Sequence, residues 1–164
     1  MIRRGDPRLR KRTQRITSID SSVRAAVAEA TETLHEIRKR YNFVRGCGIA
    51  APQIGSPWRF SVVEYGGVWY NLLNPQIIAC SDELEPTRDG CLSFFDVRGM
   101  ALRHIWVVVE YMDLDGKIQR LETHDRDFAG LVQHEVDHLD GILYEQRLAP
   151  GAELYPVPDM PAMP

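Results

Sequence analysis

Apolar residues recur every three or four positions along residues 20–41, which is the spacing of one face of a helix. These residues are Val23, Val27, Ala30, Leu34, Ile37 and Tyr41. Asp20 stands directly before the pattern, and its carboxylate can accept hydrogen bonds from the free N–H groups of a first turn. The pattern therefore predicts an amphipathic helix that packs one face on a core.

Four runs rich in β-branched and aromatic residues predict strands. The runs lie at residues 59–64, 68–73, 105–112 and 117–123. Gly66 and Gly67 join the first two, and the turn sequence Asp-Leu-Asp-Gly at 113–116 joins the last two, so each pair should form a hairpin. The Asn-Pro pair at 74–75 is expected to end the second strand.

A second helix is expected from about Asp125 to Asp140. Asp125 can cap its first turn, and Gly141 suits the left-handed conformation that often ends a helix. Strands joined by short turns, with helices at either end, indicate an α+β fold rather than a parallel α/β fold. We expect antiparallel β-sheets packed around this second, central helix, with the first helix as the N-terminal one.

The 164 residues fit one domain, which we place at residues 1–148. Residues 149–164 are a proline-rich tail, because five of the ten prolines lie there. Proline excludes a regular helix from this tail. An extended strap or a disordered segment is expected instead.

Composition is that of a soluble protein, with 44% hydrophobic and 26% charged residues. A net charge of −3 gives no overall case for nucleic acid, and DNA is not expected as a partner. The apolar runs are too short to span a membrane, and the N-terminus lacks the apolar stretch of a signal peptide. We expect a cytoplasmic monomer without a membrane partner, and three cysteines argue against a disulfide framework.

The first fifteen residues are an exception to the acidic balance. They contain Arg3, Arg4, Arg8, Arg10, Lys11, Arg12 and Arg15. This segment is either a solvated basic face or a weak contact with an anionic partner, such as RNA or a ribosomal surface.

Residues 134–138, His-Glu-Val-Asp-His, carry the strongest chemical signal. On a helix His134 and His138 lie on one face, so that both rings can reach one metal ion. Glu135 is rotated by about 100° from His134 and can approach a water held by that ion, as in H-E-x-x-H sites. The apolar flanks predict a buried helix, so the same pattern also fits hydrogen-bonded core histidines. These flanks are Leu131, Val132, Val136 and Leu139.

A catalytic metal of this kind needs a third protein ligand and an open position. Glu145 and Glu153, downstream, lie near or in the tail and are poor candidates. Cys91 lies upstream in Asp-Gly-Cys-Leu-Ser, where Gly90 lets the backbone approach closely and a thiolate is a good soft ligand. The alternative is that Cys91 is a small buried apolar residue.

Small residues also dominate residues 46–55, Gly-Cys-Gly-Ile-Ala-Ala-Pro-Gln-Ile-Gly. They permit close approach of the backbone to a ligand, and the amide of Gln53 could stabilise an oxyanion. The spacing is not that of a phosphate loop. Taken alone, the stretch is typical of a turn that leads into a strand.

Together, GCGIAAPQ at 46–53, DGCLS at 89–93 and QHEVDHLDG at 133–141 resemble the signature motifs of peptide deformylases. The segments RRGDPRLR at 3–10 and VRG at 97–99, followed by Arg103, extend the resemblance to about residues 2–148. It implies an enzyme that removes the formyl group from the N-terminal methionine of new polypeptides. It also implies one divalent metal ion, Fe²⁺ in the cell and Zn²⁺, Ni²⁺ or Co²⁺ as substitutes, held by Cys91, His134 and His138.

The resemblance further implies roles for the remaining motif residues. Glu135 would accept the proton of the attacking water, while Gln53 and the backbone N–H of Leu92 would stabilise the oxyanion. The N-formylmethionyl peptide would lie extended along the backbone, with its methionine in an apolar pocket. The residues implied in substrate binding are Gly46, Gly48, Ile49, Gly90, Arg98 and Leu131, with the ring of His134 also in the pocket wall.

Five positions depart from the family pattern. Asp89 replaces a glutamate that pairs with an arginine, here Arg103, so a looser pair is expected. Phe95 replaces a proline, and the methionine pocket carries unusual residues at three positions. These are Thr87, Asp127 and Gly130. The departures keep open a relative that acts on another N-acylated small molecule or peptide. A binding module that keeps the metal only for stability is a further alternative, against which the intact Glu135 counts. The tail also lacks the helix of many bacterial members, which weakens the expectation of ribosome docking.

Overall fold

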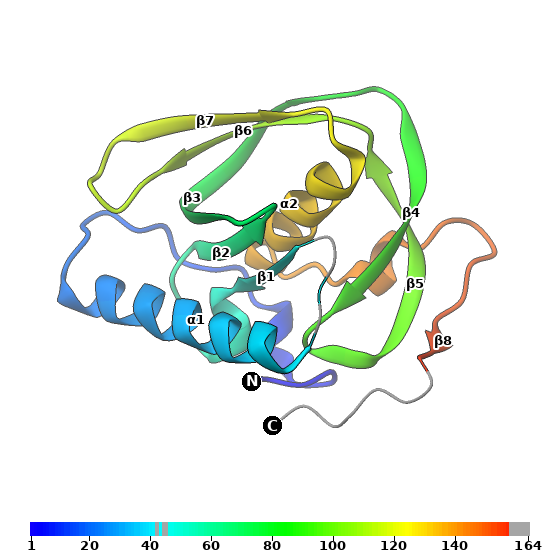
Figure 1. The fold of residues 1–164 in the computed structure, drawn as a ribbon, viewed down its shortest axis with the longest axis horizontal. Coiled ribbons are helices and arrows are strands. Elements are labelled where there is room, and N and C mark those ends of the chain that lie inside the picture. The colour runs from blue at the N-terminus through cyan, green and yellow to red at the C-terminus, as the bar shows by residue number, and fades with distance from the viewer. Residues whose placement is uncertain (42, 44–45, 158–164) are drawn as a thin grey trace.

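A five-stranded antiparallel sheet and a three-stranded one enclose a central helix (Figure 1). The structure is a computed structural model and describes residues 1–41, 43 and 46–157. The larger sheet has the order β1-β2-β3-β6-β7, and the smaller has the order β4-β5-β8. The strands are β1 Cys47–Ala50, β2 Phe60–Tyr65, β3 Val68–Cys80, β4 Leu84–Cys91, β5 Phe94–His104, β6 Val107–Met112, β7 Ile118–Thr123 and β8 Tyr155–Pro156. The predicted α+β fold is confirmed.

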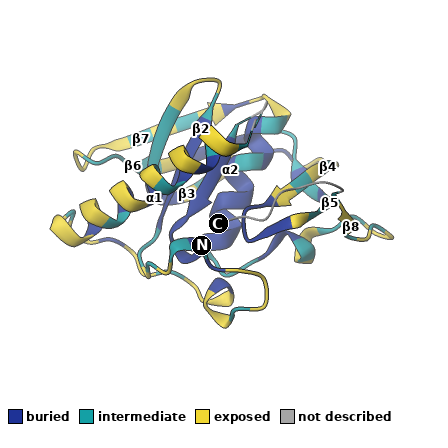
Figure 2. Ribbon diagram, turned by 60° about the horizontal axis from the view of Figure 1, so that its bottom comes forward, coloured by how far each residue is buried: buried dark blue, intermediate teal, exposed yellow. Residues whose placement is uncertain are grey.

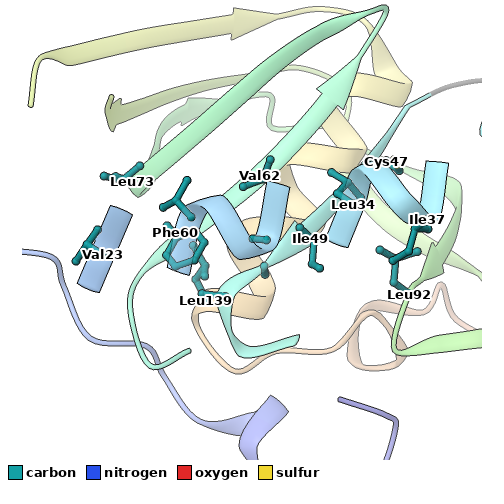
Figure 3. Packing of buried hydrophobic residues seen from close by; sticks show 14 of the residues in the cluster. Val23, Leu34, Ile37, Cys47, Ile49, Phe60, Val62, Leu73, Leu92 and Leu139 are labelled. Atoms are coloured by element: carbon teal, nitrogen blue, oxygen red, sulfur yellow. The ribbon is translucent and has the colours of Figure 1, made fainter. Parts of the chain in front are cut away.

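The N-terminal helix α1, Ser21–Arg40, begins where the pattern predicts. The carboxylate of Asp20 accepts hydrogen bonds from the backbone N–H groups of Ser22 and Val23, at 2.9 and 3.0 Å. The apolar stripe is buried against the larger sheet, while the opposite face of the helix is exposed (Figures 2 and 3).

Both predicted hairpins are present, but β3 is longer than expected. Gly66 and Gly67 have positive φ angles and join β2 to β3. Asn74 and Pro75 do not end β3. The register of the pairing between β3 and β6 shifts between Leu73 and Gln76, so that Pro75, which has no N–H, lies at an irregularity of the strand. Asn74 has φ 51° and exchanges two side-chain hydrogen bonds with the backbone of Ile16. The predicted strand end is therefore wrong.

The central helix α2, Arg126–Leu139, is capped by Asp125 and followed by Gly141 at φ +73°, as expected. A Cβ atom at Gly141 would lie 2.5 Å from the carbonyl oxygen of Arg10, so this position also needs glycine for space. Phe128, Val132 and Val136 pack against the larger sheet. No helix among the described residues is long and apolar enough to cross a membrane.

The smaller sheet was not predicted, nor was β1. Residues 46–55 were expected as a turn leading into a strand; instead strand β1 comes first and a 3₁₀ turn, Ala51–Ile54, follows it. Further along, a 3₁₀ turn at Tyr144–Arg147 leads to β8, which pairs with Val97 and Arg98 of β5. The expected extended strap is confirmed for β8; residues 158–164 lie outside the described residues, and the boundary at residue 148 stays a prediction.

Candidate metal centre

Strand β4 and helix α2 contact each other through four successive residue pairs. Two strand residues advance about 6.6–6.8 Å and four helical residues about 6.0 Å, so alternate residues of β4 meet every fourth residue of α2. Glu85 forms an ion pair with Arg126, and the Thr87 methyl group lies against Gly130. Asp89 then meets His134, and Cys91 meets His138. We call these four pairs the β4–α2 ladder.

Cys91, His134 and His138 converge at the end of the ladder. The Sγ atom of Cys91 lies 3.1 Å from Nε2 of His138, which lies 3.1 Å from Nε2 of His134. All three residues are buried, and their donor atoms lie within 4.8 Å of one another. One sulfur and two nitrogen donors in this arrangement fit a divalent transition metal with a further position open. The structure thus brings together the three predicted ligands, whose role remains a prediction.

Asp89 orients the ring of His134. The Oδ1 atom of Asp89 lies 2.8 Å from Nδ1 of His134, and the Oδ2 atom of Asp89 accepts hydrogen bonds from Arg103 at 2.7 and 3.2 Å. Burial opposes the charged form of Asp89, but His134 and Arg103 together hold its pKa below the usual range. Asp89 and Arg103 are thus in direct contact, and the expectation that this pair is looser than the glutamate pair of the family stays a prediction. A proton held on Nδ1 leaves Nε2 of His134 free to bind a metal.

Arg103 extends this network to a second carboxylate. Its Nη1 atom donates to Asp137 at 2.5 Å, and Arg147 also donates to Asp137, at 2.7 Å. Arg103 is only 3% exposed, so the two carboxylates compensate a charge that would be costly to bury alone. Asp137 is the aspartate of the His-Glu-Val-Asp-His motif, and sequence reasoning assigned it no role.

Glu135 is buried beside the cluster and depends on Gly48 for space. A Cβ atom at residue 48 would lie 2.5 Å from Oε1 of Glu135, so a larger residue would displace the carboxylate. Burial raises the pKa of Glu135 to about 7, against the opposing effect of His134. Its Oε2 atom has no hydrogen-bond partner within the described part of the chain. This carboxylate is therefore available to exchange a proton near neutral pH.

The Gln53 side chain is held with its NH₂ group towards the cluster. The backbone N–H of Ala50 donates to Oε1 at 2.8 Å, which identifies the oxygen end of the amide. The Nε2 atom donates to Ser93 Oγ at 3.1 Å and to Cys91 Sγ at 3.4 Å. Ser93 was missed by the sequence analysis, although it lies within the Asp-Gly-Cys-Leu-Ser motif.

A cavity of about 160 Å³ adjoins the cluster and is lined by most of the predicted substrate-binding residues. Ile49 is an exception, because its side chain is fully buried in the core under α1 (Figure 3). Successive strand residues point to opposite faces, so Gly48 faces Glu135 and Ile49 faces away. Its assignment to the pocket wall is wrong. The cavity is lined by Phe43, Gly46, Cys47, Gly48, Gln53, Gly90, Cys91, Leu92, Phe95, Arg98, Leu131, His134 and Glu135.

Comparisons with known proteins show which family this chain resembles. The family model described as polypeptide deformylase matches residues 1–153. A peptide deformylase of Thermomicrobium roseum is 36% identical over 168 residues, covering 97% of this chain and 90% of that protein. One of Thermotoga neapolitana is 35% identical over 152 residues, covering 92% and 87%.

Among solved structures, the chain is also similar to peptide deformylases. The crystal structure of peptide deformylase from Thermotoga maritima superposes with a TM-score of 0.82 at 32% identity, covering 92% of this chain and 97% of that one. A peptide deformylase from Synechococcus elongatus, solved in complex with actinonin, gives 0.81 at 32% identity, covering 91% and 78%.

Proposed function

The chain belongs to the polypeptide deformylase family, and we propose that the cluster of Cys91, His134 and His138 is its catalytic metal centre. The protein is a metallohydrolase that removes the formyl group from N-formylmethionine of newly made polypeptides. The observation that carries the assignment of the centre is the convergence of three buried donor atoms beside Glu135. The relatives do not favour the alternative of another N-acylated substrate.

The family is metal-dependent, and the donor set indicates which ions fit. One thiolate and two imidazoles suit Fe²⁺, Zn²⁺, Ni²⁺ and Co²⁺, and we propose Fe²⁺ as the native ion. When bound, such an ion supplies Lewis acidity, which lowers the pKa of a water molecule and polarises the formyl carbonyl. Asp89 supports the site by fixing the orientation of the His134 ring.

Glu135 is the proposed general base. It accepts a proton from the attacking water, and the water oxygen adds to the formyl carbon. The carbonyl oxygen becomes negatively charged, and Nε2 of Gln53 and the backbone N–H of Leu92 stabilise it. Glu135 then gives the proton to the leaving amine, the C–N bond breaks, and formate and a free N-terminus result.

Substrate is proposed to bind along backbone that small residues leave accessible. Gly46, Gly48 and Gly90 line the cavity and offer peptide groups to an extended chain. Arg98 also lines it, and its Nη1 atom donates to the carbonyl oxygens of Phe95 and Val97, which keeps the guanidinium near the substrate backbone. Leu131 supplies apolar contact for the first side chain.

The cellular setting is proposed to be the cytoplasm, with the chain acting as a monomer. The basic N-terminal segment gives little support to ribosome docking, because at least four of its seven basic residues form intramolecular ion pairs. Arg4 and Arg10 pair with Glu145, Arg8 pairs with Asp6, and Arg12 pairs with Asp140. The solvated basic face is therefore the favoured interpretation.

Formate release from formyl-Met-Ala, with metal content measured on the same sample, tests the function. The Glu135→Gln variant is expected to retain metal and lose about 10²- to 10⁴-fold in kcat, the usual contribution of a general base. If the wild-type protein is active and the Glu135→Gln variant is equally active, the assignment of Glu135 as the general base is contradicted. No turnover by the metal-loaded wild-type protein would contradict the function itself.

A further inference from the structure

Residues 2–4 connect two parts of the candidate site through their backbone. The N–H of Ile2 donates to the carbonyl oxygen of Gln53 at 2.7 Å, and the N–H of Arg4 donates to the carbonyl oxygen of Ser93 at 3.0 Å. Gln53 lies in the 3₁₀ turn after β1, and Ser93 lies in the turn between β4 and β5. One short segment, which we call the clamp segment, therefore holds two motifs that are distant in the sequence.

Side chains also fix the clamp segment on the protein. Ile2 is 8% exposed and belongs to the same apolar cluster as Cys91 and Phe94. The guanidinium of Arg4 lies over the ring of Phe94, 5.2 Å from its centroid, and forms an ion pair with Glu145 at 3.0 Å. The segment is thus held in one position by its side chains as well as by its backbone.

Ser93 uses each of its hydrogen-bonding groups in these contacts. Its Oγ accepts from Nε2 of Gln53 at 3.1 Å, and its N–H donates to Sγ of Cys91 at 3.4 Å, while its carbonyl oxygen accepts from Arg4. A shift of Ser93 would therefore move the acceptor that orients the Gln53 amide. Ser93 also directly follows Leu92, whose N–H is the other proposed oxyanion donor.

Both backbone bonds of the clamp segment act on the Gln53 side chain. The bond from Ile2 fixes the backbone of Gln53 itself, and the bond from Arg4 fixes Ser93, the residue that accepts from the Gln53 amide. A misplacement of about 1 Å in a positioned group can lower turnover by about 100-fold. Loss of either bond should therefore reach the chemistry even though the clamp segment touches no reacting atom.

We propose that the clamp segment positions the amide of Gln53 for the reaction, through the backbone N–H groups of Ile2 and Arg4. This inference rests on the proposed function. The oxyanion exists only after water has added, so a misplaced donor lowers kcat without weakening the binding of substrate, and KM should not change. A purely structural tether would change stability and leave the kcat of the folded protein unaltered.

Arg4→Pro removes the N–H of residue 4 and suits the turn that contains it. The N–H of Asp6 donates to the carbonyl oxygen of Arg3, and Gly5 has φ +93°, as in a type II turn, whose second position favours proline. Arg4→Ala is the matched control, because it also removes the side chain but keeps the N–H.

With formyl-Met-Ala, the kcat of Arg4→Pro is expected to lie about tenfold below that of Arg4→Ala, at equal KM and equal metal content. Gln53→Ala alone should lower kcat by about 10²- to 10³-fold, as for other oxyanion donors. Adding Arg4→Pro to Gln53→Ala should lower kcat by no more than about a further twofold, because the amide that the clamp segment positions is then absent.

Equal kcat in folded Arg4→Pro and Arg4→Ala would overturn the inference and leave the deformylase function standing, as would a tenfold loss that persists in the Gln53→Ala background. Ile2→Pro against Ile2→Ala makes the same comparison at the Gln53 carbonyl and decides the question if Arg4→Pro does not fold. No turnover by the metal-loaded wild-type protein would overturn the proposed function, and the role of the clamp segment with it.

Discussion

Helix α2 meets the two sheets in different ways. Towards the five-stranded sheet it presents Phe128, Val132 and Val136, which pack in an apolar cluster with residues of β2, β3 and β6. Towards β4 and β5 it presents polar groups, each with a specific partner, such as His134 with Asp89. Gln133 adds two hydrogen bonds of 2.9 Å to the backbone of His104.

The apolar side of α2 therefore contributes mainly to stability, and its polar side mainly positions the groups of the candidate site. Apolar burial is non-directional and holds the helix in place without specifying atomic positions closely. Hydrogen bonds and ion pairs specify particular atoms, which a metal centre requires. Substitutions on the polar side should therefore change metal binding and turnover, and those on the apolar side should mainly change stability.

The largest effect is expected for Cys91→Ala. Removing the thiolate leaves two imidazoles, which underligate the ion, so metal should be lost and activity with it. Elemental analysis of purified protein and formate release measure both. Retention of wild-type metal content would show that Cys91 is not the third ligand.

A large loss of turnover is also expected for Gly48→Ala, by at least about a hundredfold in kcat. The added Cβ atom meets Oε1 of Glu135 at 2.5 Å and must displace the base from its position. Because the three atoms nearest to the added Cβ all belong to Glu135, which is not one of the proposed ligands, metal content should stay at the wild-type level. Loss of metal together with activity would argue for a wider distortion of the site.

Asp89→Asn is expected to weaken metal affinity by about 10- to 100-fold, the usual effect of altering a group that orients a metal ligand. Asp137→Asn is its matched control, since both carboxylates accept hydrogen bonds from Arg103 but Asp89 is the one beside His134. Metal titration of the two variants measures the difference. Equal weakening would mean that Arg103, rather than the histidine contact, determines affinity.

Val132→Ala tests the apolar side of α2. The side chain is fully buried, and its truncation should lower the free energy of unfolding by about 2 kcal/mol through lost burial and a residual cavity. Denaturant unfolding gives the stability, and kcat/KM below the unfolding transition should match the wild type. A large loss of kcat/KM in folded protein would break the separation between the two sides.

The smallest effect is expected at the surface. Arg12 is 79% exposed in its ion pair with Asp140, so Arg12→Ala should change the free energy of unfolding by less than about 1 kcal/mol. Salt should reduce even this difference. Unfolding at low and high ionic strength measures it.

Sequence periodicity predicted the apolar side of the molecule well. The α1 stripe and both hairpins follow from alternation and helical spacing, because burial repeats with the period of the element. Strand β4 was missed because its inward positions are polar, including Thr87 and Asp89, while Leu84 points outward. Because β4 faces the proposed metal centre, its inward positions do not show the alternation of apolar and polar residues that identifies a strand.

The candidate site could be predicted only in part. Spacing alone placed His134 and His138 on one helical face, whereas the choice of Cys91 came from the family resemblance and needed long-range contacts to bring it near. Ile49 was assigned to the wrong face because strand β1 was not predicted. In a strand the side chain of Ile49 points away from the face on which Gly48 lies. Ser93 was missed because a lone serine carries no spacing signal.

In the β4–α2 ladder, the spacing of alternate residues along β4 nearly matches the spacing of every fourth residue along α2. The two spacings differ by about 0.7 Å per step, so the offset between strand and helix grows to about 2 Å over the four pairs. A single-residue deletion in α2 would rotate every following side chain by about 100° and misalign all later pairs at once. Insertions and deletions in this family should therefore be tolerated outside this helix and strand, and almost never within them.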